Sequence, residues 1–568
     1  MTTPLRVPTA IDAAAEAYLE DLVALDPVEA TLLGLRGHED RLTDYSPEGH
    51  QARAELHRGT LARLSRLDPV DDVDAVTRAA MRERLELALA WHEEGLDAAD
   101  VNNIASPVQH VREVFDLSAS ASVEDWQRIR LRLAAVPQTL AGYRAALDAA
   151  PPAVTAAARQ VSAAAAQAEE FAESGGFFAL LPEQARLASG EPLPAALAGE
   201  LAAGARAAAE AYAQLAAWLR EHLLPRAPQR DAVGRAAYPL HSRLHLGMVI
   251  DPEESYAWGL DELAAIEDEA AAVAREIVPG AGREFAVPEA LAALDADPSR
   301  QIEGAEAFRD WMQELSDRAV SDLAGRDFEI PDDIRTLVCR IAPSTSGVIY
   351  YTGPTEDFSR PGQMWWAVPK GVTSFSTWRE ASTVYHEGVP GHHLQIARAA
   401  YCRDRLNRWR RQGCWVSGHG EGWALYAERL MAERGYLADP GYRMGQLDAQ
   451  ALRAARVVVD IGVHCRLPAP DEVGGGVWDA AKAWTFLRAH TQVPDANLRF
   501  ELERYLGWPG QAPAYKVGER VWLELRDAVR RREGAGFDLC AFHSRVLDLG
   551  SVGLDVLRDA VLTREVPG

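Results

Sequence analysis

Residues 386–395 read His-Glu-Gly-Val-Pro-Gly-His-His-Leu-Gln, so three imidazoles lie close to one carboxylate. Neutral imidazoles can hold a zinc ion, and a neighbouring carboxylate can take a proton from a metal-activated water. In the common HExxH pattern, the second imidazole follows the first by four residues on the same helix face. Here that position is Pro390, which cannot bind metal, and the next imidazoles are His392 and His393.

The spacing of these histidines requires an interrupted helix. In a straight helix, residues seven apart point the same way but lie about 10.5 Å apart along the axis. Two nitrogens on one zinc ion each lie about 2 Å from it, so the helix must break between them. Pro390-Gly391 is suited to break it. A two-residue bulge would bring His392 to the second ligand position, so we favour His386 and His392 as ligands and keep His393 as the alternative. The simpler interpretation is a His-rich turn without metal.

A second motif follows in residues 418–428, Gly-His-Gly-Glu-Gly-Trp-Ala-Leu-Tyr-Ala-Glu. Glu421 follows His392 by 29 residues, which suits a carboxylate ligand on a second helix. Glu428 lies two turns after Glu421 on the same face and suits a partner that orients a ligating imidazole. Without a metal, Glu421 would be a solvated residue favoured at a helix start by the helix dipole.

Later in the chain, several residues could support such a site. Arg453, Arg456, Asp460 and His464 recur at helical spacing, either as a buried ion-pair network or as partners of the metal ligands. Tyr515 is a candidate donor to a developing oxyanion. Lys516 or Arg504 could hold a substrate carboxylate, although each could equally be a surface residue, and His543 is more typical of a core histidine.

The surrounding sequence is mainly helical, with one exception. Apolar residues recur at helical spacing in residues 10–26, and the Ala-rich stretches 153–172 and 195–222 indicate long packed helices. Short β-branched and aromatic runs at 336–341, 348–351 and 363–368 predict a small sheet within about 336–370. Turn signals fall at 150–152, 224–228, 276–299, 343–347 and 467–477. We expect an N-terminal helical region (1–230) and a C-terminal catalytic region (231–568) in one continuous two-lobed unit.

The composition of the chain argues against several classes of function. The chain has 568 residues and a formal net charge of −25, which argues against nucleic-acid binding and against anchoring on anionic lipid. Five cysteines, with no CxxC pair, indicate reduced thiols. No signal-like segment and no apolar run of about 18 residues is evident. We therefore expect a cytoplasmic monomer or homodimer without a nucleic-acid or membrane partner.

The motifs resemble those of the bacterial family named domain-of-unknown-function 885. The residues that carry the resemblance are His386–Gln395, Glu421–Glu428, Arg504-Tyr505, Trp508–Ala512, Tyr515-Lys516, the opening Pro27–Thr31 with Gly34 and Asp40–Leu42, and the mid-chain Tyr350-Tyr351 and Arg360–Gly362. The resemblance implies a large helical zincin-like architecture, similar in plan to neurolysin and angiotensin-converting enzyme, with a small sheet before the metal-binding helix. It does not imply a substrate. The stretch 465–476 departs from the family pattern, which puts the role of this loop in doubt.

Taken together, the sequence predicts a zinc-dependent hydrolase, with a metallopeptidase acting on short peptides as the first hypothesis. His386, His392 and Glu421 would hold one zinc ion, and Glu387 would act as general base, with Tyr515 as oxyanion donor. Substrate contacts are expected from Tyr350, Tyr351, Arg360 and Lys516, and supporting contacts to the ligands from Glu428, Asp460 and His464. The alternatives are hydrolysis of a small non-peptide amide and a metal-binding protein without turnover.

Overall fold

The computed structural model describes residues 6–280, 282, 286–342 and 349–563. Within this part of the chain helices dominate and strands are few and short, which confirms the prediction of a mainly α protein. The helices are α1 (Ala10–Leu25), α2 (Pro27–Leu32), α3 (Pro47–Leu64), α4 (Asp72–Glu94), α5 (Pro107–Asp116), α6 (Val123–Ala149), α7 (Ala158–Ala172), α8 (Phe177–Gln184), α9 (Ala195–Trp218), α10 (Tyr238–Leu246), α11 (Pro252–Ile277), α12 (Ala286–Ala296), α13 (Ala305–Leu323), α14 (Thr377–Glu387), α15 (His392–Tyr401), α16 (Ser417–Glu433), α17 (Pro440–Cys465), α18 (Ala480–His490), α19 (Asp495–Gly507), α20 (Ala514–Glu533), α21 (Leu539–Leu547) and α22 (Leu554–Leu562).

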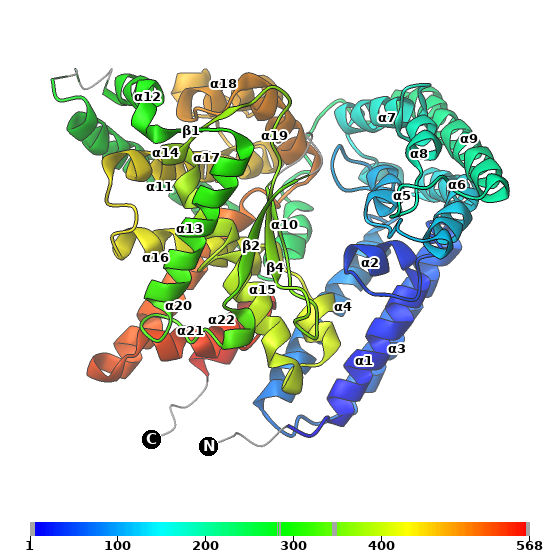
Figure 1. Cartoon of the computed structure of the whole chain (residues 1–568), viewed down its shortest axis with the longest axis horizontal. Helices are drawn as coiled ribbons and strands as arrows, with labels where there is room; N and C mark the ends of the chain where they lie inside the picture. Colours follow the sequence, from blue (N-terminus) through cyan, green and yellow to red (C-terminus); the bar gives the residue numbers. More distant parts are fainter. Residues whose placement is uncertain (1–5, 281, 283–285, 343–348, 564–568) are drawn as a thin grey trace.

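Helices α5–α9 lie together at the upper right of Figure 1, apart from the C-terminal helices. Two large hydrophobic cores organise most of the helices. The smaller core draws its side chains from α2 and α5–α9 and includes the fully buried Leu133, Leu201 and Tyr212. The larger core joins the C-terminal helices to α1 and α4, through residues such as Leu19 and Met81. The larger core therefore includes residues on both sides of the expected division at residue 230, and the division into two regions stays a prediction.

The long N-terminal helices follow the predicted pattern closely. Helix α1 matches the stretch 10–26, and Thr9 caps it by accepting hydrogen bonds from the first backbone N–H groups. Helix α7 begins at Ala158, later than the predicted 153, because a 3-10 turn over Pro152–Val154 follows the proline pair. Helix α9 ends in a π-helical turn over Leu219–Leu223, so its predicted length is confirmed.

A small three-stranded sheet lies before the helix that carries the histidines, as predicted. Its strands are β2 (Leu337–Ile341), β3 (Tyr350–Thr352) and β4 (Gly362–Trp366), in the order β2-β4-β3. Strand β2 runs parallel to β4, and β3 runs antiparallel to it. Met364 and Trp366 pack with Phe308 and Met312 of α13, so one face of the sheet is covered. The predicted turn at 343–347, together with Val348, lies outside the described residues.

A second strand pair and one correction complete this region. Strands β1 (Gln301–Glu303) and β5 (Ser374–Ser376) pair antiparallel directly before α14. The predicted turn at 276–299 is wrong in part, since α12 lies inside it. Ala290, Leu291 and Leu294 give that helix an apolar face, which packs into the larger core despite the nearby prolines. The predicted loop at 467–477 is confirmed, with a short 3-10 turn over Asp471–Val473.

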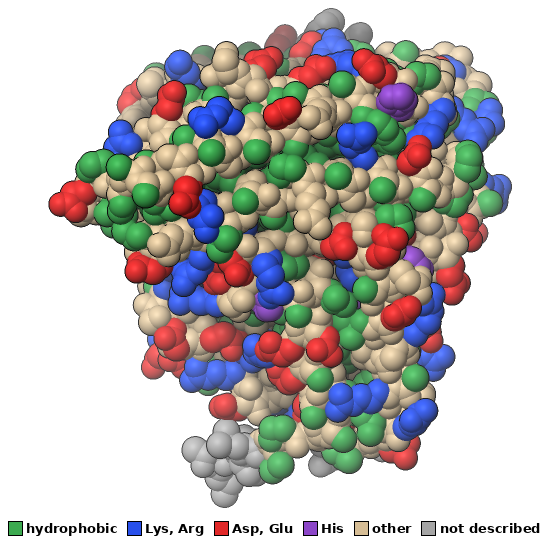
Figure 2. All heavy atoms as spheres, turned by 90° about the vertical axis from the view of Figure 1, so that its right-hand side faces the viewer, with side chains coloured by type: hydrophobic (Ala, Val, Ile, Leu, Met, Phe, Trp, Pro, Cys, Tyr) green, Lys and Arg blue, Asp and Glu red, His purple; other side chains and the backbone are tan. Residues whose placement is uncertain are grey.

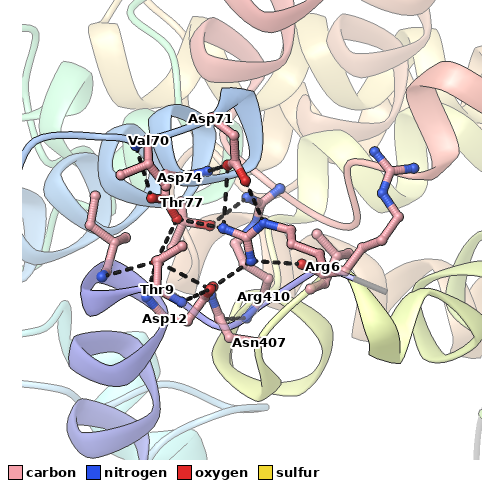
Figure 3. Close-up of polar contacts among 12 residues, drawn as sticks. Arg6, Thr9, Asp12, Val70, Asp71, Asp74, Thr77, Asn407 and Arg410 are labelled. Atoms are coloured by element: carbon pink, nitrogen blue, oxygen red, sulfur yellow. Dashed lines mark hydrogen bonds and ion pairs between the residues drawn. The ribbon is translucent and has the colours of Figure 1, made fainter. Parts of the chain in front are cut away.

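Arg6 ties the beginning of the described chain to both neighbouring helices (Figure 3). Its guanidinium donates to Asp12 of α1 at 2.6 Å and to Asp74 of α4 at 2.5 Å. It also reaches the carbonyl oxygen of Arg405, in the C-terminal half, at 3.3 Å. The Asp74 side chain is only 1% exposed, so this arginine neutralises a carboxylate that is cut off from water.

The outer face of the N-terminal helices carries acidic and basic side chains interspersed with apolar ones (Figure 2). No described helix is long and apolar enough to cross a membrane. All five cysteines are free thiols, and four of them are buried. The expectations about partners and cellular location stay predictions.

Candidate metal centre

The break between α14 and α15 positions the two histidines. Helix α14 ends at Glu387 and α15 begins at His392, so the residues between them form the predicted interruption. Trp423 of α16 holds this segment, because its indole N–H donates to the carbonyl oxygens of Pro390 at 3.0 Å and Gly391 at 3.2 Å. A side chain at position 391 would collide with the chain, since a Cβ there would lie 1.8 Å from the carbonyl oxygen of His386. The turn is therefore closely packed on both sides.

His386, His392 and Glu421 converge on one point. One ligand atom from each lies within 4.8 Å of the other two. Glu421 Oε2 is 3.4 Å from His386 Nε2 and 3.7 Å from His392 Nε2. The side chains are largely buried, with Glu421 the most open at 19% exposed. Two imidazole nitrogens and one carboxylate oxygen are a donor set that zinc accepts in sites with an open position.

The two adjacent histidines differ in what occupies their nitrogens. His393 is committed on both sides, with Nδ1 3.0 Å from the Tyr351 hydroxyl and Nε2 2.8 Å from the carbonyl oxygen of Ile334. The Nδ1 atom of His392 is buried and has no hydrogen-bond partner among the described residues. The other ring nitrogen of His392, Nε2, faces Glu421 Oε2 at 3.7 Å, whereas both nitrogens of His393 are already bonded, which favours the first choice made from the sequence.

Glu428 holds the imidazole ring of His386 through a hydrogen bond on the side away from Glu421. Its Oε1 accepts from His386 Nδ1 at 2.8 Å, which leaves Nε2 to face Glu421 and His392. Ser382 Oγ donates to the other carboxylate oxygen, and Arg453 lies 3.3 Å from Oε1. Glu428 is fully buried and stays charged, because Arg453, His386 and Ser382 outweigh the effect of burial and lower its pKa. The expected orienting contact of Glu428 is thus present.

The carboxylates at the centre differ in their acid–base behaviour. Burial raises the pKa of Glu387 above its ordinary value, although the neighbouring imidazoles work against this shift. Burial would also raise the pKa of Glu421, but its contacts with His386 and His392 outweigh that effect and lower it. The pKa values of these two neighbouring carboxyl groups are therefore shifted in opposite directions.

Tyr515 lies at the edge of this group. It is half-buried near the N-terminus of α20, and the guanidinium carbon of Arg456 lies 4.8 Å from its ring centroid. Burial and the charge of Glu421 raise its pKa, so the phenol keeps its proton at neutral pH. A protonated phenol can donate a hydrogen bond to developing negative charge.

Three expected contacts are not supported by the structure. Asp460 accepts from the Tyr238 hydroxyl at 2.7 Å and from the backbone N–H of Gly510 at 3.0 Å, so it is occupied away from the metal ligands. His464 Nε2 instead lies 2.9 Å from the carbonyl oxygen of Tyr505. The Lys516 ammonium is 1% exposed and bonds to Glu262, Gln450 and Glu519, so it is not free to hold a substrate.

The other sequence-predicted residues are placed as follows. Tyr350 is 40% exposed and stacks on Trp365, while Tyr351 reaches His393. Arg360 is exposed and donates to the carbonyl oxygen of Gly353 at 2.9 Å. Their role in substrate binding stays a prediction. His543 is a core histidine, as expected, bonded to Tyr426 and to the carbonyl oxygen of Asp327.

Two residues near the centre were not singled out from the sequence. Ser382 lies one turn before His386 on α14, a spacing that marks a shared helix face. Trp415 is 46% exposed, and its ring centroid lies 6.1 Å from that of His392. An aromatic residue shortly before the Gly-His-Gly-Glu motif is the signal that could have identified it.

Comparisons with known proteins agree with the fold. The profile of a family described as bacterial protein of unknown function (DUF885) matches residues 27–561. A proposed lipoprotein from Colwellia psychrerythraea is similar over 97% of this chain and 98% of its own, with a TM-score of 0.82 and 24% identity. A proposed lipoprotein of unknown function from Shewanella oneidensis is similar over 98% and 100%, with a TM-score of 0.76 and 16% identity. No curated protein matches. At these identities the likeness shows a shared fold alone.

Proposed function

The chain belongs to the DUF885 family, and from that premise we propose that it is a zinc-dependent hydrolase, a metallopeptidase that cleaves short peptides. The observation that carries the proposal is the convergence of His386, His392 and Glu421, with Glu387 directly beside the first ligand. Two imidazoles and a carboxylate so close together inside a protein are costly unless something compensates them. A divalent cation would compensate them.

The donor set fits zinc. The ligand atoms would be His386 Nε2, His392 Nε2 and a carboxylate oxygen of Glu421, while Glu428 would fix the tautomer and orientation of His386. When bound, zinc would supply Lewis acidity, which lowers the pKa of water and polarises a carbonyl group.

The remaining steps belong to side chains of this chain. Glu387 would take a proton from the attacking water and pass it to the leaving amine. Tyr515 would donate its phenol proton in a hydrogen bond to the oxygen of the attacked carbonyl group. Trp415, exposed beside His392, would form one wall of the site and exclude water from it.

We also propose the finer architecture, a helical zincin-like arrangement. It is supported by a histidine-bearing helix pair, a neighbouring helix that supplies a glutamate, and a small sheet preceding both. This arrangement differs from the common HExxH plan by the Val389-Pro390-Gly391 interruption of the helix. Because of the interruption, His392 would take the ligand position that belongs, in an unbroken HExxH helix, to the histidine four residues after the first.

The proposal is tested by exchanging one carboxylate for an amide. Glu387→Gln should lower peptide hydrolysis by about 10²- to 10⁴-fold, the range expected for loss of a general base, while zinc content stays unchanged. Glu380→Gln is the matched control on the same helix; burial raises the pKa of Glu380 to about 7, so losing its charge costs little. The activity is measured with zinc-loaded protein on di- to decapeptides.

The outcomes separate the hypotheses. Undiminished hydrolysis by Glu387→Gln would refute the proposed mechanism. Full zinc content with no turnover of any peptide by the parent protein would favour a small non-peptide amide as substrate.

A further inference from the structure

Beside the proposed centre, two buried arginines share one carboxylate. Arg456 of α17 lies 2.8 Å from Glu501 of α19, and Arg504 lies 2.7 Å from the same carboxylate oxygen. Arg456 also donates from Nε to the Tyr505 hydroxyl at 2.6 Å, and Tyr505 donates to Glu501. The arginine side chains are 11% and 7% exposed. The two guanidinium groups therefore share the carboxylate of Glu501 as their counter-ion.

The charged residues next to Arg456 on α17 do not provide a second counter-ion for the two guanidinium groups. Asp460, one turn beyond Arg456, bonds to Tyr238 and to the amide of Gly510, and makes no direct bond to either guanidinium. Arg453, one turn before, lies against Glu428. Arg456 donates through Nε and Nη2, and no hydrogen bond of its Nη1 atom is found among the described residues. This atom is also not among the fully buried donors, so it remains open to a carboxylate from outside the chain.

Tyr515 connects this arginine pair to the proposed centre. Its ring lies under Arg456 at 4.8 Å. Helix α20 crosses α16 closely one turn after Tyr515, because a Cβ on Gly422, the residue after Glu421, would lie 2.5 Å from the Cα of Gly518. One tyrosine side chain therefore separates the arginines from the proposed metal ligands. A peptide end reaching from the arginines past this side chain would be short, since an extended chain covers roughly 3.3–3.6 Å per residue.

We propose that Arg456 and Arg504 bind the free C-terminal carboxylate of a peptide, so that the enzyme cleaves one or two residues from that end. This inference rests on the function proposed above and names its substrate class. Guanidinium groups bind carboxylates through paired, charge-assisted hydrogen bonds, which a neutral amide cannot reproduce. The anchor would fix the scissile bond relative to Glu387 and Tyr515, and thereby exclude internal cleavage of long chains.

The test compares two peptides that differ only at the carboxyl end. A short peptide with a free carboxylate should be cleaved with a kcat/KM at least about tenfold higher than its C-terminal amide, since bonds to charged groups discriminate by that amount or more. Arg456→Gln should remove most of this preference, mainly through KM, while Arg456→Lys should retain part of it. Arg82→Gln is the control, because Arg82 is exposed and forms a surface ion pair with Glu86 one turn later on the same helix.

A binding measurement keeps the inference separate from catalysis. Zinc-loaded Glu387→Gln should bind the free-acid peptide at least about tenfold more tightly than the amide, as measured by calorimetry. Equal binding and equal cleavage of the two peptides would overturn the anchor and leave the hydrolase proposal standing. The two-peptide comparison on the parent protein decides the inference by itself, so it does not depend on the folding or zinc content of Arg456→Gln.

Discussion

At the scale of single residues, hydrogen bonds decide which histidine can serve as a ligand. His393 and His392 are neighbours in the sequence, yet both nitrogens of His393 are bonded, to Tyr351 and Ile334, while Nε2 of His392 faces Glu421. Glu428 fixes the orientation of the His386 ring in a similar way. It accepts a hydrogen bond from Nδ1, so that Nε2 points toward Glu421. The chemistry of the centre therefore depends on contacts that spacing alone does not reveal.

His543 illustrates a different consequence of burial, a stability that depends on pH. Burial lowers the pKa of His543 to about 4, so the folded protein resists protonation that the unfolded chain accepts near 6.5. Between these values the unfolded state binds more protons, and the free energy of unfolding must fall as the pH falls.

We expect His543→Gln to lose less stability on acidification than the parent. Relative to neutral pH, the difference at pH 4 should reach about 3 kcal/mol, from roughly 1.36 kcal/mol per pKa unit. Urea unfolding at pH 7 and at several values down to 4 measures it. Buried His241, with its own lowered pKa, adds a slope of the same sign to both proteins, so the difference between them is the informative quantity. Parallel curves would contradict the assignment.

At the scale of elements, the interruption between α14 and α15 is the feature on which the centre depends. Gly391→Ala should disrupt it, because the added methyl group would lie 1.8 Å from the carbonyl oxygen of His386 and 2.5 Å from that of Tyr385. We expect loss of zinc binding and destabilisation of about 1–3 kcal/mol. Gly59→Ala, inside α3 with nothing within 4 Å, is the control and should be neutral or stabilise by about 0.5–1 kcal/mol. Wild-type zinc content in Gly391→Ala would show that the turn is not needed.

Sequence periodicity predicted the elements better than it predicted their neighbours. The long helices, the small sheet and the break at Pro390-Gly391 follow from local patterns that tertiary contacts did not override. The stripe from Arg453 to His464 lies in a part of α17 where residues 454–465 are all buried, and its members face different partners. Arg453 meets Glu428, Arg456 meets Glu501, and Asp460 meets Tyr238. The spacing of residues in the sequence shows which of them share a helix face. Only the tertiary packing of the helices decides which partner each residue meets.

At the scale of the whole molecule, one arginine connects segments that are far apart in the sequence. Arg6 bonds to Asp12 and Asp74 and reaches the backbone of Arg405 (Figure 3). Arg6→Ala should lower the free energy of unfolding by on the order of 3 kcal/mol, because it leaves a buried carboxylate unpaired. Arg82→Ala removes an exposed helical pair and should change stability by less than about 0.5 kcal/mol. Urea midpoints measure both, and equal effects would contradict the structural role of Arg6.

The central claim is that residues 386–421 build a zinc site, and metal content tests it most directly. Elemental analysis of protein purified without added metal or chelator would compare the parent, His392→Gln and His393→Gln. We expect about one zinc per chain in the parent and in His393→Gln, and little in His392→Gln. Absence of zinc from all three, even after zinc is offered, or equal zinc in His392→Gln and the parent, would contradict the account.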